Sequence, residues 1–290
     1  LLLLATPAVL RRLVSPPAML LGIALLAFAP TMVVYSSEGK QYMVETLAAV
    51  LLLRLALDGR AAPDRAASLR LAAAGTLAVW IAGSSVLVLA GMAPALLLPR
   101  TGHGQRRIVA AICLSWTASF AAAYALVYRA AAANLYIGRF WAPAFLAPEA
   151  DVAGRSWLAV KDFVWGFIAG HAGVARRPEA DGLVAAAGVI ACGCVVAGWV
   201  RLARTRGFPT AMLVAGPLIA AAAASALGLY PVGQRLLLFA VPLLVVLGVA
   251  GVEGATARLS PAWQRRAWLF LGGLTVSPLL AISVFQASTM

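Results

Sequence analysis

Charged residues are scarce in this chain. They make up 11% of its 290 residues, against roughly 25% in an ordinary globular domain. So few charges cannot cover the surface of a soluble protein. Hydrophobic residues make up 63% of the chain, the mean hydropathy is +0.93, and the apolar residues form continuous blocks with the charges gathered between them. The composition therefore excludes a soluble enzyme, a disordered chain and a coiled coil, and it predicts an all-α, polytopic bundle of transmembrane helices.

Cysteine and histidine are rarer still. The three cysteines, Cys113, Cys192 and Cys194, all lie inside apolar blocks, where we expect them to act as small buried hydrophobes. The two histidines, His103 and His171, fall in segments that we expect on opposite sides of the membrane. The sequence contains neither a P-loop nor a dinucleotide-binding fingerprint. We therefore expect no disulfide framework, no metal site and no bound cofactor.

Acidic residues number only ten against 23 lysines and arginines, which gives a net charge of +13. A basic excess of this kind is typical of nucleic-acid-binding proteins. Here, however, most basic residues stand in short clusters beside apolar runs, which is the pattern of cytoplasmic loops in membrane proteins. The expected surroundings are therefore membrane lipids, and no nucleic-acid partner is expected.

The apolar runs predict the membrane helices, since a crossing needs about 20 residues at about 1.5 Å each. The chain starts with four leucines, without a methionine or a basic leader, so its start resembles the tail of a membrane helix. We interpret residues 1–290 as a single transmembrane domain and as the C-terminal portion of a longer protein. After a stub at 1–10, the predicted runs are 18–34, 41–57, 70–82, 84–98, 108–128, 182–200, 209–228, 235–253 and 267–286.

Residues 70–98 are too long for one span and too short for two. Gly83-Ser84-Ser85 divides them into halves of about 14 residues, each about 21 Å long. A short helical hairpin places fifteen of the 23 basic residues on one side, whereas a single span splits them. The sequence therefore predicts a hairpin with both ends on the cytoplasmic side of the inner (plasma) membrane. The fifteen residues are Arg11, Arg12, Arg54, Arg60, Arg65, Arg70, Arg100, Arg106, Arg107, Arg201, Arg204, Arg206, Arg258, Arg265 and Arg266.

The opposite, outer side receives three segments and seven of the ten acidic residues. The segments lie near 35–45, 129–181 and 229–235. In the external loop 129–181, apolar and aromatic residues recur at helical spacing and predict a helix over 156–170 that lies in the outer interface. These recurring positions are Trp157, Val160, Val164 and Phe167. Such aromatic residues either anchor the chain at the membrane surface or contribute to a substrate site.

The first candidate site is the outer segment Tyr35-Ser36-Ser37-Glu38-Gly39-Lys40-Gln41-Tyr42, which Glu45 follows. Ionisable groups at a membrane boundary are costly, and they either reach toward water or serve function. Lys40 can act as a point charge for a phosphate, and the tyrosines can donate hydrogen bonds to it. The alternative is a solvated loop in which Glu38 and Lys40 are merely polar.

The second candidate site is Tyr230-Pro231-Val232-Gly233-Gln234-Arg235, which opens an apolar run on the same side. The guanidinium of Arg235 can hold a phosphate through two parallel hydrogen bonds, and a helix N-terminus favours anions. The alternative is an interfacial arginine that reaches toward lipid headgroups. A third candidate is the hairpin tip, where Ser84 or Ser85 can cap the second half-helix and leave backbone N–H groups facing a cavity.

Both outer segments resemble elements of the GT-C superfamily of membrane glycosyltransferases, and in particular of family 39, the dolichyl-phosphate-mannose-protein mannosyltransferases. Residues 35–42 are similar to a Y-S-x-E-x-K-x-Y element of that family. Residues 230–239, followed by Pro242, are similar to a Y-P-F-G-x-R-L-L-L-F-x-x-P element near the end of such chains. Residues 139–145 resemble an external Y-W-x-x-A-F segment, and the resemblance extends over about 18–255.

The resemblance implies transfer of a sugar from a polyprenyl-phosphate-linked donor to an acceptor, which is a lipid, a glycan or a protein, at the outer face of the membrane. It implies that Lys40 and Arg235 contact the lipid phosphate and that Glu38, Tyr42 and Tyr230 line the cavity. The catalytic acid of the family lies in the first external loop, before the region matched here, so no catalytic residue is assigned and the chain alone is expected to be inactive.

Two other classes of protein remain compatible with the sequence. A transporter or flippase of lipid-linked precursors also uses broken helices and a cation in a cavity. A non-catalytic membrane subunit is the third possibility. The long external segment favours the enzyme over the transporter, and so does the lack of a charged relay deep in the apolar runs.

Overall fold

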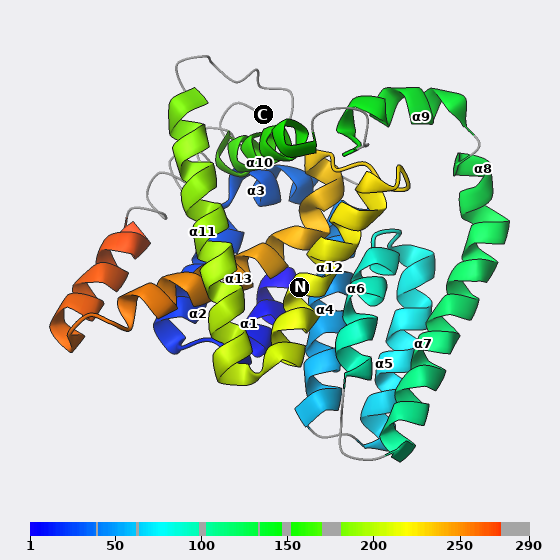
Figure 1. The fold of residues 1–290 in the computed structure, drawn as a ribbon, viewed down its shortest axis with the longest axis horizontal. Coiled ribbons are helices and arrows are strands. Elements are labelled where there is room, and N and C mark those ends of the chain that lie inside the picture. Colours follow the sequence, from blue (N-terminus) through cyan, green and yellow to red (C-terminus); the bar gives the residue numbers. More distant parts are fainter. Residues whose placement is uncertain are drawn as a thin grey trace.

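The computed structural model describes residues 1–38, 40–61, 64–98, 103–132, 134–146, 152–169 and 181–273. Within them every regular element is helical, so the predicted all-α polytopic bundle is confirmed (Figure 1). The elements are α1 (Leu2–Leu13), α2 (Pro16–Phe28), α3 (Pro30–Ser37), α4 (Tyr42–Ala61), α5 (Arg65–Ile81), α6 (Ser85–Leu97), α7 (His103–Ala123), the π-helical turn η1 (Tyr124–Tyr128), α8 (Arg129–Ala132), α9 (Leu135–Trp141), the 3₁₀ turn η2 (Ala142–Ala144), α10 (Val152–Ala169), α11 (Asp181–Arg206), α12 (Phe208–Ala226), the 3₁₀ segment η4 (Gln234–Ala240) and α13 (Val241–Thr256). A last helical stretch covers 261–273.

The exposed surface of the long helices is apolar. On α11, the side chains of Leu183 and Ile190 are 75% and 66% exposed, which is unfavourable in water and favourable in lipid. In the described part of the chain, four helices are long and apolar enough to cross a membrane, and a bent pair makes a fifth candidate. The protein is therefore membrane-embedded. The four segments are Gln105–Tyr128, Asp181–Arg206, Phe208–Ala226 and Arg235–Thr256.

The predicted run 18–34 is broken in the structure. Helix α2 ends at Phe28 and α3 begins at Pro30, with a bend of 49° between them. Proline is tolerated in the first turn of a helix but cannot continue one, because it lacks the N–H group and clashes with the preceding turn. The break turns α3 away from the axis of α2, so α3 ends at the first candidate site.

Helix α4 matches the predicted run 41–57, but it differs in character from a simple membrane span. It carries Glu45, Arg54, Asp58 and Arg60, and it is not among the four helices that are apolar enough to cross a membrane. Its apolar side chains are instead in the core of the bundle, where they are almost fully buried. They include Ala49, Val50, Leu52, Leu53 and Ala56.

The predicted hairpin at 70–98 is present, formed by α5 and α6 with a turn at 82–84 (Figure 1). Backbone N–H groups of Gly83 and Ser84 face Glu45 in the first turn of α4. At the other end of α4, Arg60 Nη1 donates a hydrogen bond of 2.9 Å to the carbonyl of Ala95 near the end of α6. Helix α6 therefore runs parallel to α4, and the chain reverses direction at the tip of the hairpin.

Several of the arginine-rich loop ends come together in the structure. Arg12 at the end of α1 forms an ion pair with Asp58 at the end of α4. The carboxylate of Glu253 on α13 accepts a hydrogen bond of 3.2 Å from the backbone N–H of Ser15. The same carboxylate forms an ion pair of 3.1 Å with Arg201 of α11. These contacts agree with the prediction that the arginine clusters share one side, and their cytoplasmic location remains a prediction.

The predicted helix over 156–170 corresponds to α10, which lies across one end of the bundle and contacts α11 (Figure 1). Trp157 and Val160 pack against α11, where a Cβ added to Gly188 would lie 3.2 Å from the Trp157 ring. Lys161 forms an ion pair of 3.3 Å with Asp181 at the start of α11. The side chain of Phe167 lies outside the described residues, and the position of α10 in the lipid interface remains a prediction.

Glycines allow two helix pairs to touch backbone to backbone. A Cβ added to Gly91 of α6 would overlap the backbone of Gly216 in α12, and the reverse is also true. Gly198 of α11 and Gly251 of α13 form a second crossing, where added Cβ atoms would overlap the carbonyls of Leu247 and Cys194. Close crossings at small residues are the usual way in which helices associate in lipid. The first crossing brings α6 and α12 together, and the second brings α11 and α13 together.

Candidate functional site

The two outer segments predicted from the sequence meet at the end of the bundle where α3 ends and α4 begins. The second segment reaches this place because α12 stops at a glycine. Gly228 has a φ of +69°, and the N–H of Leu229 donates a hydrogen bond of 2.8 Å to the carbonyl of Ala224. This is the usual C-terminal motif of a helix, and it redirects the chain. Residues 229–233 then lead into η4, which carries Arg235.

In the first segment, Lys40 is already paired with an acid. Its Nζ lies 2.9 Å from Oε2 of Glu38, and the Lys40 side chain is 56% exposed. Tyr35 and Tyr42 are in edge-to-face contact behind this pair, with 5.5 Å between ring centroids. Glu38 thus compensates the charge of Lys40, while Gly39 lies outside the described residues.

Arg235 is held by aromatic rings and not by a carboxylate. Its guanidinium carbon lies over the Trp141 ring, 4.9 Å from the centroid, and 6.0 Å from the centroid of Phe140. Among the described residues, no aspartate or glutamate forms a salt bridge with Arg235. Arg235 and Glu38 both lie close enough to Tyr35 for their charges to act on its phenol. Within the described residues, the second segment therefore places beside the first a positive charge that has no acidic partner.

Tyr230 belongs to the second segment and lies near Tyr42 of the first. It is largely buried, and its hydroxyl donates a hydrogen bond of 2.8 Å to the carbonyl of Leu236. Burial raises the pKa of the Tyr230 phenol, and the nearby Glu45 and Tyr42 raise it further. The phenol therefore keeps its proton and its role as a donor over the physiological range.

The hairpin tip is filled by protein and does not open into a cavity. The Glu45 side chain is 5% exposed, and its carboxylate faces the backbone N–H groups of Gly83 and Ser84. A Cβ added to Gly83 would lie 3.8 Å from both Glu45 Oε1 and the Tyr128 hydroxyl. The expectation that these N–H groups face a cavity was wrong, because an acid from α4 occupies the anion position at the start of α6.

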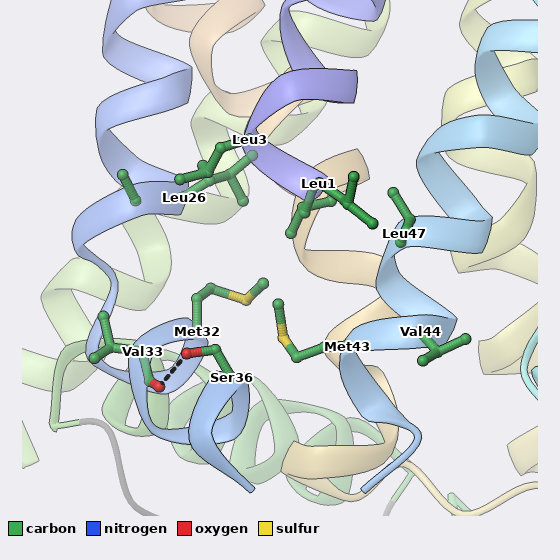
Figure 2. A pocket seen from close by; sticks show the side chains of 11 residues that line it. Leu1, Leu3, Leu26, Met32, Val33, Ser36, Met43, Val44 and Leu47 are labelled. Carbon is green, nitrogen blue, oxygen red and sulfur yellow. Dashed lines mark hydrogen bonds between the residues drawn. The ribbon is translucent and has the colours of Figure 1, made fainter. Parts of the chain in front are cut away.

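An apolar groove of about 410 Å³ lies between the first residues of the chain, the break between α2 and α3, and the start of α4. Figure 2 shows Met32 and Met43 pointing toward each other across it, with Leu1, Leu3 and Leu26 on the side away from Ser36. The hydroxyl of Ser36, its one polar side chain, is satisfied by a hydrogen bond of 2.7 Å to the carbonyl of Val33. The lining of the groove is therefore almost entirely apolar. The groove lies where the chain passes from α3 to α4.

The structure thus brings Glu38, Tyr42, Tyr230 and Arg235 into one neighbourhood, with the exposed Lys40 at its edge. Sequence reasoning missed two partners, Phe140 and Trp141. The aromatic residues of the external segment were noticed, but their contact with Arg235 depends on how the helices pack. Tyr128 was missed as well, and its hydroxyl donates a hydrogen bond of 2.7 Å to the carbonyl of Val79.

The fold and this site define a membrane-embedded helical protein with a cationic, tyrosine-rich site at one end of its bundle. No protein-family model, curated protein or solved structure matches the chain.

Proposed function

We propose that the protein is the membrane core of a glycosyltransferase that takes a sugar from a polyprenyl-phosphate-linked donor and transfers it to an acceptor at the outer face of the membrane. The observation that carries the proposal is Arg235. It is a cation without a described acidic partner, and it lies beside two tyrosines at the end of a membrane-embedded bundle. The phosphodiester of such a donor supplies the missing negative charge, and so does the polyprenyl phosphate that leaves after the transfer.

The neighbourhood of Arg235 suits the rest of such a donor. The apolar groove between the break of α2 and α3 and the start of α4 has a volume of about 410 Å³. It suits part of an isoprenoid chain, because its lining is almost entirely apolar. Tyr42 can donate a hydrogen bond to a phosphate or a sugar hydroxyl. The Tyr230 hydroxyl already donates its proton to the carbonyl of Leu236, so it can only accept a hydrogen bond, from a sugar hydroxyl. Cations at this position would stabilise the phosphate as it leaves. The carboxylate that activates the acceptor is expected from the first external loop of the family and is not assigned to a residue here.

Binding of a polyprenyl phosphate to the protein in lipid nanodiscs tests the proposal. We expect Arg235→Ala to weaken binding about ten- to hundredfold, the equivalent of about 1.5–3 kcal/mol for a charge-assisted hydrogen bond. Arg235→Lys should also weaken binding, because a forked donor becomes a point charge. We expect a smaller loss for Lys40→Ala, because Glu38 already neutralises Lys40.

The matched control is Arg155→Ala, which removes an exposed arginine from α10. It should leave the affinity unchanged. An Arg235→Ala variant that binds the lipid as tightly as the unmodified protein would contradict the proposed function.

A flippase of lipid-linked precursors is the second candidate, and the 49° break between α2 and α3 favours it. Broken helices line the substrate sites of many transporters. Movement of a labelled polyprenyl phosphate between the leaflets of proteoliposomes distinguishes the two functions, because the glycosyltransferase does not require it.

A further inference from the structure

The guanidinium of Arg235 lies over the ring of Trp141. The guanidinium carbon lies 4.9 Å from the centre of the Trp141 ring. The same ring also packs against Gly233, where an added Cβ would lie 2.7 Å from its Cζ3 atom. A larger residue at position 233 would therefore displace the ring from beneath Arg235.

The segment that carries Trp141 is fastened to the loop that carries Arg235. The N–H of Val232 donates a hydrogen bond of 2.7 Å to the carbonyl of Ala144. The N–H of Leu146 donates one of 3.0 Å to the hydroxyl of Ser225, which is fully buried. These two hydrogen bonds hold the chain just after Trp141 against the end of α12 and against the loop that leads to Arg235, which keeps the ring close to the guanidinium.

A guanidinium can bind an aromatic ring and a phosphate at the same time. The ring interacts with its flat face, whereas its five N–H donors point outward in the plane and form the fork that a phosphate accepts. We propose that Trp141 is the positioning residue for Arg235, and that its ring fixes the plane of the guanidinium so that the N–H edge faces the lipid phosphate. This inference rests on the proposed function.

A double-mutant cycle on polyprenyl-phosphate affinity in nanodiscs tests the inference. We expect Trp141→Ala to weaken binding about two- to thirtyfold, the range of a cation–π contact. Trp141→Phe keeps an aromatic face and should recover most of the affinity. In the Arg235→Ala background, Trp141→Ala should have no further effect, because Trp141 acts through Arg235. An equal loss in both backgrounds would overturn the inference and indicate a general structural role.

The molecule offers a matched control for the same chemistry. Arg266 lies over the Trp263 ring at 5.1 Å, and Trp263→Ala should not change the affinity. An unchanged affinity in Trp141→Ala, with a loss in Arg235→Ala, would overturn the inference alone. An unchanged affinity in Arg235→Ala would contradict the proposed function, and the inference would fall with it.

A second readout does not involve the lipid. Phenylglyoxal modifies arginines, and mass spectrometry measures its rate at Arg235. The Trp141 ring covers one face of the guanidinium, so Trp141→Ala should raise the rate and Trp141→Phe should not. Equal rates in all three proteins would also overturn the inference.

Discussion

Glu45 is a buried acid in an apolar bundle, and such a group needs a partner of opposite polarity. The free N–H groups at the start of α6 provide it, since Gly83 and Ser84 face the carboxylate. The contact joins the first turn of α4 to the hairpin tip, so that one side chain caps a helix far away in the sequence.

Replacing Glu45 should therefore loosen the hairpin. We expect Glu45→Ala to lower the free energy of unfolding by about 1–3 kcal/mol, because it leaves buried N–H groups without an acceptor. Glu45→Gln keeps an acceptor oxygen and should cost less. Thermal unfolding in detergent measures both. The exposed Gln41, one turn earlier, supplies the control Gln41→Ala. Equal stability of the control and Glu45→Ala would rule out the capping role.

The sequence predicted the residues of the site better than their contacts. Tyr42, Tyr230 and Arg235 were identified because polar groups at the end of an apolar run are costly and therefore informative. The ring beneath Arg235 was not identified, because neither periodicity nor charge relates Trp141 to a residue so far away in the chain. Only the turn at Gly228 and the folding of 134–146 over it bring the two together.

Among the elements, the hairpin formed by α5 and α6 was predictable because the distribution of arginines allows only one topology. The break between α2 and α3 follows from Pro30, whose ring cannot continue a helix. The central position of α4 was not predictable, since its apolar run is similar to the others. Burial of α4 depends on tertiary partners, and among them is the α1 helix whose Arg12 pairs with Asp58.

Two glycines of α11 should respond oppositely to the same substitution. A Cβ at Gly198 would overlap the carbonyl of Leu247 in α13, whereas the Cβ of Gly193 would meet no atom within 4 Å. We expect Gly198→Ala to destabilise the protein by about 1–3 kcal/mol through overpacking. Gly193→Ala should stabilise it by about 0.5–1 kcal/mol through helix propensity. Denaturant titration in mixed micelles compares them, and a stabilising Gly198→Ala would show that the two helices do not touch there.

At the scale of the whole molecule, the fold class could be predicted from composition alone, because a chain with so few charges can be stable only in lipid. The arginines also predict its sidedness, which remains a prediction. Composition does not predict which helices pack against each other. Apolar helix surfaces are chemically alike in lipid, and the positions of small residues decide which of them come into contact.

Cysteine labelling tests the sidedness. In a background without Cys113, Cys192 and Cys194, single cysteines at positions 65, 103 and 205 should react only with reagents that reach the cytoplasm. A cysteine at position 41 should react from outside intact cells, which makes it the positive control. Labelling of position 103 from outside would contradict the hairpin and require a single span over 70–98.

We expect the charges of α4 to affect how the protein is inserted into the membrane during synthesis. A charged residue near the centre of a membrane helix costs about 2.5–3.5 kcal/mol at the translocon, so α4 is a poor candidate for entering lipid unaided. Arg12, the partner of Asp58, is synthesised before α4. Ala95, whose carbonyl accepts the hydrogen bond of Arg60, is synthesised after it. We therefore expect α4, the central helix of the bundle, to enter the bilayer late, together with helices that precede and follow it in the sequence.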